Sequence, residues 1–117
     1  METATEKQRI IQEYVPGKQI TLAHVIASPQ RSLYRNLGLD ESIGDAIGIL
    51  TITPSEGVII AADIATKSGS VEIGFLDRVS GSLLIYGDVA SVESAVHSVL
   101  GYFSDQFKYY TVQMTKT

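Results

Sequence analysis

The chain has 117 residues, which suits one domain of the usual size of about 100–150 residues, and its 44% hydrophobic and 19% charged residues exclude a disordered or fibrous protein. A net charge of −4 argues against nucleic acid and anionic membranes as partners, and the lack of cysteine excludes disulfides, thiolate metal sites and cysteine nucleophiles. Because apolar runs fall far short of the ~20 residues that span a bilayer, and no signal pattern opens the sequence, we expect a cytoplasmic protein.

The first part of the chain predicts a tail and two strands. Residues 1–9 are polar and without periodicity, so we expect a flexible tail. Residues 10–15 are a short strand candidate, and Pro16-Gly17 supplies the two central residues of a type II turn that closes it. Residues 20–27 are rich in β-branched side chains and predict a second strand.

A short helix and a loop come next. Ser28 predicts an N-cap with Pro29 at the first helical position, and Gly38 predicts the end of this helix. Residues 38–45 are expected to form a polar loop.

The central part of the chain alternates between strands and a helix. Residues 46–53 predict a buried strand, and residues 53–56 (Thr-Pro-Ser-Glu) read as a capping box that starts a helix running to Lys67. Residues 71–77 and 83–87 predict the two strands of a hairpin.

A second amphipathic helix and a last strand complete the pattern. Asp88 predicts an N-cap, and residues 109–115 alternate as in a strand. Gly48 and Gly74 interrupt two strands, which suggests a bulge or the close approach of another element. The apolar face of the second helix is Val89, Val92, Val96, Val99, Phe103 and Phe107.

Taken together, the predicted elements of residues 46–115 follow the strand–helix–strand–strand–helix–strand order of an α+β, ferredoxin-like domain, with an extra strand–strand–helix block before it.

The residues that could carry chemistry are few and isolated. His24 and His97 are far apart in the sequence and neither has a set of metal ligands around it, so structural roles are favoured. Asp63 and Lys67, four positions apart, predict an ordinary surface ion pair on one helix. No nucleophile elbow, phosphate-binding loop or zinc-protease motif occurs. We therefore expect neither an enzyme nor a metal or cofactor site.

Several segments resemble the bacterial-microcompartment (BMC) shell domain. These are residues 46–53, 60–67, 71–77 and 87–93. Residues 10–27 resemble the circularly permuted branch of this family, the propanediol-utilisation U and ethanolamine-utilisation S type, in which the strand and helix that end an ordinary domain stand first. The resemblance covers residues 9–117 and explains the extra block.

The resemblance implies a ferredoxin-like βαββαβ BMC domain, circularly permuted, in a hexamer. It divides the chain into a flexible tail (1–9), a barrel strand with its turn (10–17) and the permuted shell domain (18–117). Six copies of the first strand are expected to form a parallel β-barrel that caps the central pore. The barrel strand is Ile10, Ile11, Gln12, Glu13, Tyr14 and Val15. Since six inward carboxylates would oppose one another's ionisation, we expect Ile10, Gln12 and Tyr14 to point inward and Glu13 outward.

The function that the resemblance implies is structural. Hexamers tile with other shell proteins into a microcompartment shell in the cytoplasm, around an aldehyde-producing pathway, with encapsulated enzymes as further partners. Lys67 matches a lysine of contacts between hexamers. The loop equivalent to the one that lines the pore in ordinary members is Arg78, Val79, Ser80, Gly81 and Ser82.

Two other classes of function stay open at this stage. A small-molecule-binding regulatory domain on the same sheet would bind a ligand saturably and form no lattice. An enzyme subunit with its site at a subunit boundary would need partners for Asp63, Asp77 or His24.

Overall fold

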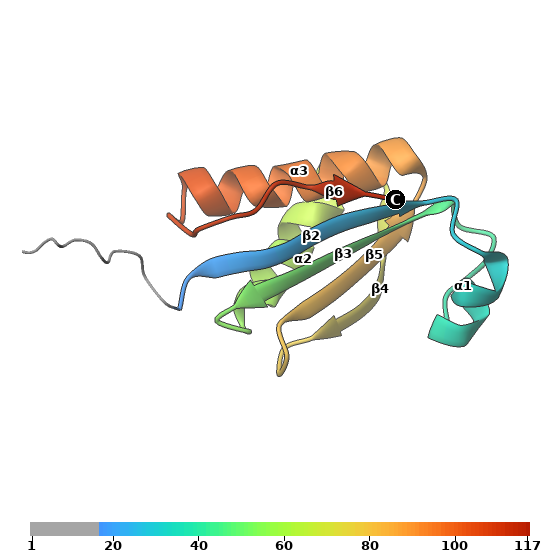
Figure 1. Ribbon diagram of the computed structural model, residues 1–117, viewed down its shortest axis with the longest axis horizontal. Helices are drawn as coiled ribbons and strands as arrows, with labels where there is room; N and C mark the ends of the chain where they lie inside the picture. The colour runs from blue at the N-terminus through green and yellow to red at the C-terminus, as the bar shows by residue number, and fades with distance from the viewer. Residues whose placement is uncertain (1–16) are drawn as a thin grey trace, which may run out of the picture.

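The protein is described by a computed structural model over residues 17–117, which contain a five-stranded sheet and three helices (Figure 1). The strands are β2 (Gln19–Ala27), β3 (Ala46–Thr53), β4 (Val71–Asp77), β5 (Ser82–Gly87) and β6 (Thr115–Lys116), and the helices are α1 (Arg31–Leu37), α2 (Gly57–Ser68) and α3 (Val89–Asp105). The predicted tail of residues 1–9 and the predicted strand of residues 10–15 lie outside the described residues.

The sheet has the spatial order β4-β5-β3-β2-β6. The first four strands pair antiparallel with their neighbours, whereas β6 pairs parallel with β2. The predicted strands 46–53 and 71–77 are confirmed with their bounds, and β2 and β5 each begin one residue before the predicted start. Elements β3, α2, β4, β5 and α3 follow one another in the predicted order.

The predicted last strand, residues 109–115, is wrong. Within residues 17–117, the chain after α3 pairs with the sheet at one bridge, between Gln19 and Tyr110, and then at β6. Tyr109 turns into the core instead, where its ring meets that of Phe103 edge-on at 4.7 Å between centroids. The alternating pattern of this segment therefore reflects contacts with the core and with the sheet edge, not a continuous ladder.

Helices α2 and α3 cover one face of the sheet and enclose the larger core. Phe103 and Leu50 are fully buried there, and Gly48 lets α3 approach β3, because a Cβ at this position would lie 2.9 Å from Val92 Cγ1. α3 contributes Val92, Ala95, Val96, Val99 and Phe103 to this core. Phe107 lies beyond the end of α3 but still packs edge-on against Phe103.

The other face of the sheet is covered at one end by α1 and the loop of residues 38–45 (Figure 1). Tyr34 and Leu39 pack there on Ile47, Leu84 and Tyr86. The ladder between β4 and β5 shifts register between Ile73 and Phe75, which is the bulge that Gly74 suggested.

Two predicted helix starts are wrong. Ser28 has a left-handed backbone (φ 53°), and its N–H donates to Asp45 O, which extends the β2–β3 pairing beyond Ala27 and Ala46. Ser28 therefore does not cap a helix, and α1 begins at Arg31 after Gln30. The predicted capping box of residues 53–56 forms a turn in which Gly57 N–H donates to Pro54 O at 2.9 Å, so α2 begins only at Gly57. The Gly38 end of α1 is confirmed by its left-handed conformation (φ 74°).

The predicted cap of α3 is confirmed. The Asp88 carboxylate accepts a hydrogen bond from Ser91 N–H at 2.9 Å, and its backbone is extended, as an N-cap requires. These hydrogen bonds lower the pKa of Asp88, because they favour its charged form.

Candidate functional site

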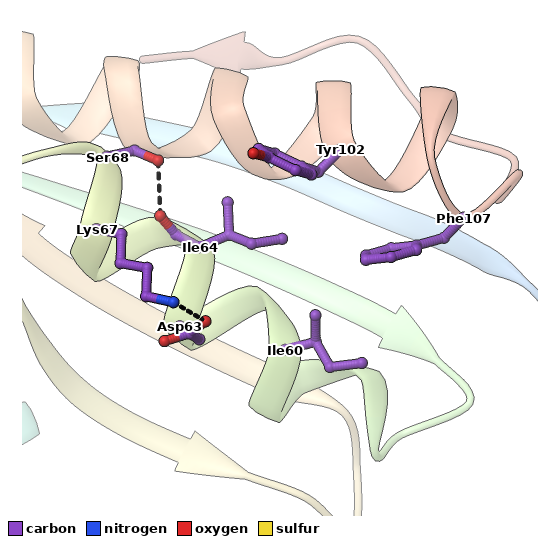
Figure 2. A pocket seen from close by; sticks show the side chains of 7 residues that line it. All are labelled: Ile60, Asp63, Ile64, Lys67, Ser68, Tyr102 and Phe107. Carbon is purple, nitrogen blue, oxygen red and sulfur yellow. Dashed lines mark hydrogen bonds and ion pairs between the residues drawn. The ribbon is translucent and has the colours of Figure 1, made fainter.

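A groove of about 400 Å³ runs between α2 and the C-terminal part of α3. Figure 2 shows the side chains that line it, with Tyr102 and Phe107 on one side and the α2 residues on the other. The lining residues are Ile60, Asp63, Ile64, Lys67, Ser68, Tyr102 and Phe107. Large apolar side chains stay open to solvent here, with Ile60 47% and Tyr102 52% exposed.

Helix periodicity explains one wall of the groove. Ile60, Asp63 and Lys67 recur at spacings of three and four residues and therefore share one face of α2. Ser68 ends this face and donates its hydroxyl to Ile64 O at 2.7 Å. The opposite wall consists of Tyr102 of α3 and Phe107 of the turn that follows α3. The groove between the two walls exists only once α2 and α3 are packed together.

Lys67 lies on this groove and forms the predicted ion pair. Its Nζ is 2.9 Å from Asp63 Oδ2, and the two side chains are 75% and 58% exposed (Figure 2). The hydrogen bond to Asp63 raises the pKa of Lys67. Because both side chains are so exposed, this pair contributes little to folding stability and leaves Lys67 available for contacts outside the protomer.

The predicted pore-equivalent loop is held by its own hydrogen bonds. The Asp77 carboxylate accepts from the N–H groups of Val79 and Ser80 at 2.9 and 3.3 Å, which lowers the pKa of Asp77. Gly81 has a left-handed backbone (φ 79°), and its carbonyl accepts from Ile52 N–H of β3. Val79 is 86% exposed at the tip.

The structure keeps these two predicted sites apart. Lys67 precedes β4 and the loop of residues 78–81 follows it, so the strand separates them. Arg78 to Gly81 form the loop, whereas Ser82 is the first residue of β5. One protomer therefore presents two separate surfaces and no combined site.

The two histidines have different surroundings. His24 is half-buried, with Nδ1 2.6 Å from Thr115 Oγ1 and Nε2 3.0 Å from Thr117 Oγ1, whereas His97 is exposed on α3. Within residues 17–117, no group of three or more His, Asp or Glu side chains is arranged to hold a metal ion. None of the helices in the described part is long and apolar enough to cross a membrane.

Sequence reasoning missed part of the groove. The sequence pattern does not mark Tyr102 or Ile60 as site residues, and it places Phe107 on the buried face of α3. The available signal is a large apolar residue that does not lie on the buried face of its helix. Tyr102 is the sequence neighbour of the core residue Phe103, and Ile60 is the neighbour of the core residue Ala61, so both point away from the core.

Comparisons with known proteins agree with this architecture. Residues 46–114 match the family described as BMC domain. The chain is 54% identical to the bacterial microcompartment shell protein PduU of Salmonella typhimurium over all of both chains, and 48% identical to the shell protein EutS of Escherichia coli over 96% of this chain and 99% of EutS. A solved structure described as a CutR flat hexamer has a TM-score of 0.83 and 50% identity, covering 94% of this chain and 100% of the CutR chain. The chain therefore belongs to the BMC-domain family.

Proposed function

We propose that this chain is a structural shell protein of a bacterial microcompartment in the cytoplasm. It forms a cyclic hexamer that tiles with other shell proteins around an aldehyde-producing pathway, and it has no catalytic role. The observation that carries this proposal is the likeness of the protomer to a CutR chain described as part of a flat hexamer, over the whole of that chain. The 54% identity to the shell protein PduU over the full length of both chains supports the same role.

A ring of six identical copies needs two different patches on each protomer, because head-to-tail contacts join unlike surfaces. This chain offers apolar surface on unlike elements: Ile60 and Tyr102 on the helices, and Phe75 on β4. Burial of such side chains between copies would drive association.

Static light scattering of the purified full chain tests the hexamer. We expect about six times the chain mass of 12.7 kDa, and flat hexagonal particles or sheets by electron microscopy. A monomer at micromolar concentration would overturn the proposal. Saturable binding of a small molecule by such a monomer would favour a regulatory domain instead.

The domain is proposed to be circularly permuted. β2 pairs with β3 along its length and separates it from β6, although β2 precedes the matched BMC segment of residues 46–114. A strand that ends an ordinary domain would take this position beside β3 if it were moved to the front. On this proposal residues 1–9 are a tail, 10–17 a barrel strand with its turn, and 18–117 the shell domain.

Residues 10–15 are proposed to cap the pore as a six-stranded parallel barrel, with Ile10, Gln12 and Tyr14 inward. Six short strands closed into a ring leave no free edge, whereas one alone has no stability of its own. We expect a variant that lacks residues 1–15 to admit small polar solutes faster into reconstituted shells. Unchanged permeability together with unchanged hexamer stability would exclude the cap.

Lys67 is proposed to contact the neighbouring hexamer. Its exposure at the rim of an apolar groove supports this role, because its stem can pack flat on a partner while the ammonium finds acceptors. Lys67→Ala should keep the hexamer and weaken sheet formation or shell incorporation, whereas Lys108→Ala, which removes another exposed lysine, should change neither. If the Lys67→Ala hexamer dissociates into monomers, Lys67 contacts a neighbouring subunit within the hexamer instead of a neighbouring hexamer.

The loop Arg78–Ser82 is proposed to face the symmetry axis. Its fixed backbone and its exposed tip at Val79 support a lining role. In the variant without residues 1–15, Arg78→Glu should change the relative passage of anions and cations. If Arg78→Glu leaves the relative passage of anions and cations unchanged, the loop does not line the pore.

A further inference from the structure

The last strand of the sheet is too short to hold itself by backbone pairing. β6 consists of Thr115 and Lys116, paired with His24 and Val25 of β2. Two further backbone bonds extend this pairing, from Thr117 N–H to Val25 O and from Ala27 N–H to Thr117 O, both at 2.9 Å. A parallel edge strand of this length needs additional contacts to stay in register.

Side chains supply these contacts on one face of the sheet. His24 points to the face opposite the buried Ala23 and Val25, because neighbouring strand residues alternate. Its two ring nitrogens reach Thr115 Oγ1 at 2.6 Å and Thr117 Oγ1 at 3.0 Å. Since a hydroxyl can donate or accept, both nitrogens are satisfied whichever of them carries the proton.

The residue between the two threonines is held on the other face. Lys116 alternates with Thr115 and Thr117, and its Nζ is 2.5 Å from Glu93 Oε2 on α3. In Figure 1, β6 lies between β2 and α3, as this pairing requires. Side-chain contacts therefore hold β6 on both faces of the sheet.

We propose that these five side chains form a two-sided clamp that closes the β2 edge of the sheet, with His24 as its positioning residue. The side-chain contacts of the clamp compensate for the small number of backbone hydrogen bonds between β6 and β2. The His24 imidazole holds Thr115 and Thr117, and the ion pair with Glu93 holds Lys116 between them. Release of the clamp frees the outer N–H and C=O groups of β2, a template for strand pairing with another copy of the chain. The clamp residues are His24, Glu93, Thr115, Lys116 and Thr117.

Hydrogen–deuterium exchange of the assembled full chain, followed by mass spectrometry, tests the clamp. In the His24→Leu variant we expect the peptide that ends at Thr117 to exchange about tenfold faster or more, while the β3 peptide keeps its protection. His97→Leu, at the exposed histidine of α3, is the matched control and should leave both peptides unchanged. Equal exchange in the two leucine variants would overturn the clamp.

Conservative replacements separate positioning from packing. His24→Asn should place an amide near the position of Nδ1 and keep the bond to Thr115, and His24→Gln should reach toward Thr117 as Nε2 does. Both variants should recover part of the protection lost in His24→Leu. If neither differs from the leucine variant, His24 does not position the strand.

A double-mutant cycle covers the case in which His24→Leu fails to fold. Thr117→Val removes the hydroxyl at an exposed position and should by itself speed exchange of the last peptide severalfold. In a His24→Asn background, which keeps the bond to Thr115 but has already lost the bond to Thr117, the two changes should be non-additive, because both remove one contact. Full additivity, or no effect of Thr117→Val, would contradict the clamp.

Discussion

The two faces of the sheet are covered in different ways. On one face, α2 and α3 run along the strands and bury a continuous core that includes Leu50 and Phe103. On the other, α1 and the loop after it cover one end through Tyr34 and Leu39, while Phe75 of β4 stays exposed. The first face holds the fold together, and the second carries a small local unit with open sheet beside it.

The difference has a physical cause. Regular helices repeat their contacts at each turn, so one amphipathic face covers several strands. The segment of residues 28–45 has only two turns of helix and is anchored mainly by the two buried side chains Tyr34 and Leu39. We therefore expect core substitutions on the first face to unfold the whole domain and those on the second to loosen one end.

The largest expected effect is from Phe103→Ala. This side chain is fully buried between α3 and the sheet and meets the rings of Phe107 and Tyr109. Its loss should lower the free energy of unfolding by about 3–5 kcal/mol. Chemical denaturation monitored by far-UV circular dichroism measures this, and a loss below about 1 kcal/mol would mean that the first face is not the main source of stability.

Tyr34→Ala should have a smaller and more local effect. Tyr34 is fully buried against Tyr86, with its ring centroid 6.3 Å away, but α1 can collapse onto the vacated space. We expect a loss of about 2–3 kcal/mol and faster hydrogen exchange confined to residues 28–45. Exchange that rises equally in α3 would show that the two faces unfold together.

Gly48→Ala tests the close approach of α3 to the first face. The added Cβ would lie 2.9 Å from Val92 Cγ1 and 3.1 Å from Ile85 Cγ1, so we expect a loss of about 1–2 kcal/mol. Gly101→Ala is the matched control, because nothing lies within 4 Å of a Cβ there and alanine favours a helix. Thermal unfolding of the two variants should shift in opposite directions.

Tyr34→Phe should change stability by less than about 1 kcal/mol. Within residues 17–117, the buried Tyr34 hydroxyl has no hydrogen-bond partner, so its removal costs no such bond. The guanidinium of Arg31 lies 5.0 Å from the ring centroid, and this contact remains in the variant. A clear loss of stability in urea would indicate a partner for the hydroxyl, such as a bound water.

The smallest effect is a pH dependence at the start of α3. Since hydrogen bonds lower the pKa of Asp88 in the folded state, its contribution is present above the ordinary carboxyl value of about 3.9 and is lost as pH falls through the lower folded value. Asp88→Asn should still cap the helix but flatten this part of the stability profile. Asp105→Asn, at the other end of α3, serves as the control; identical acid profiles for the two variants would exclude Asp88 as the cause.

The sequence predicted the first face better than the second for reasons that particular residues show. Val92, Val96, Val99 and Phe103 recur at helical spacing, and β3 is a run of apolar residues, so local periodicity was enough. The backbone of Ser28 is held by a hydrogen bond to Asp45, and the short β6 depends on contacts with His24, both distant in the sequence. No local pattern encodes such contacts.

The candidate site divides in the same way. The pairing of Lys67 with Asp63 follows from their spacing on one helix and was predicted. The facing wall of the groove combines Tyr102 with Phe107 from beyond the helix end, so it required the tertiary structure.

In the loop at the tip of the β4–β5 hairpin, the contacts that hold the backbone do not involve the side chains at its tip. Its backbone is fixed by the Asp77 carboxylate, by Gly81 and by the bond to β3, none of which uses the side chains of Arg78 or Val79. These two side chains can therefore diverge between relatives in charge and size with little cost to folding, because the scaffold that presents them does not change. Such a loop lets evolution alter what a protein surface attracts or repels without redesigning the fold beneath it.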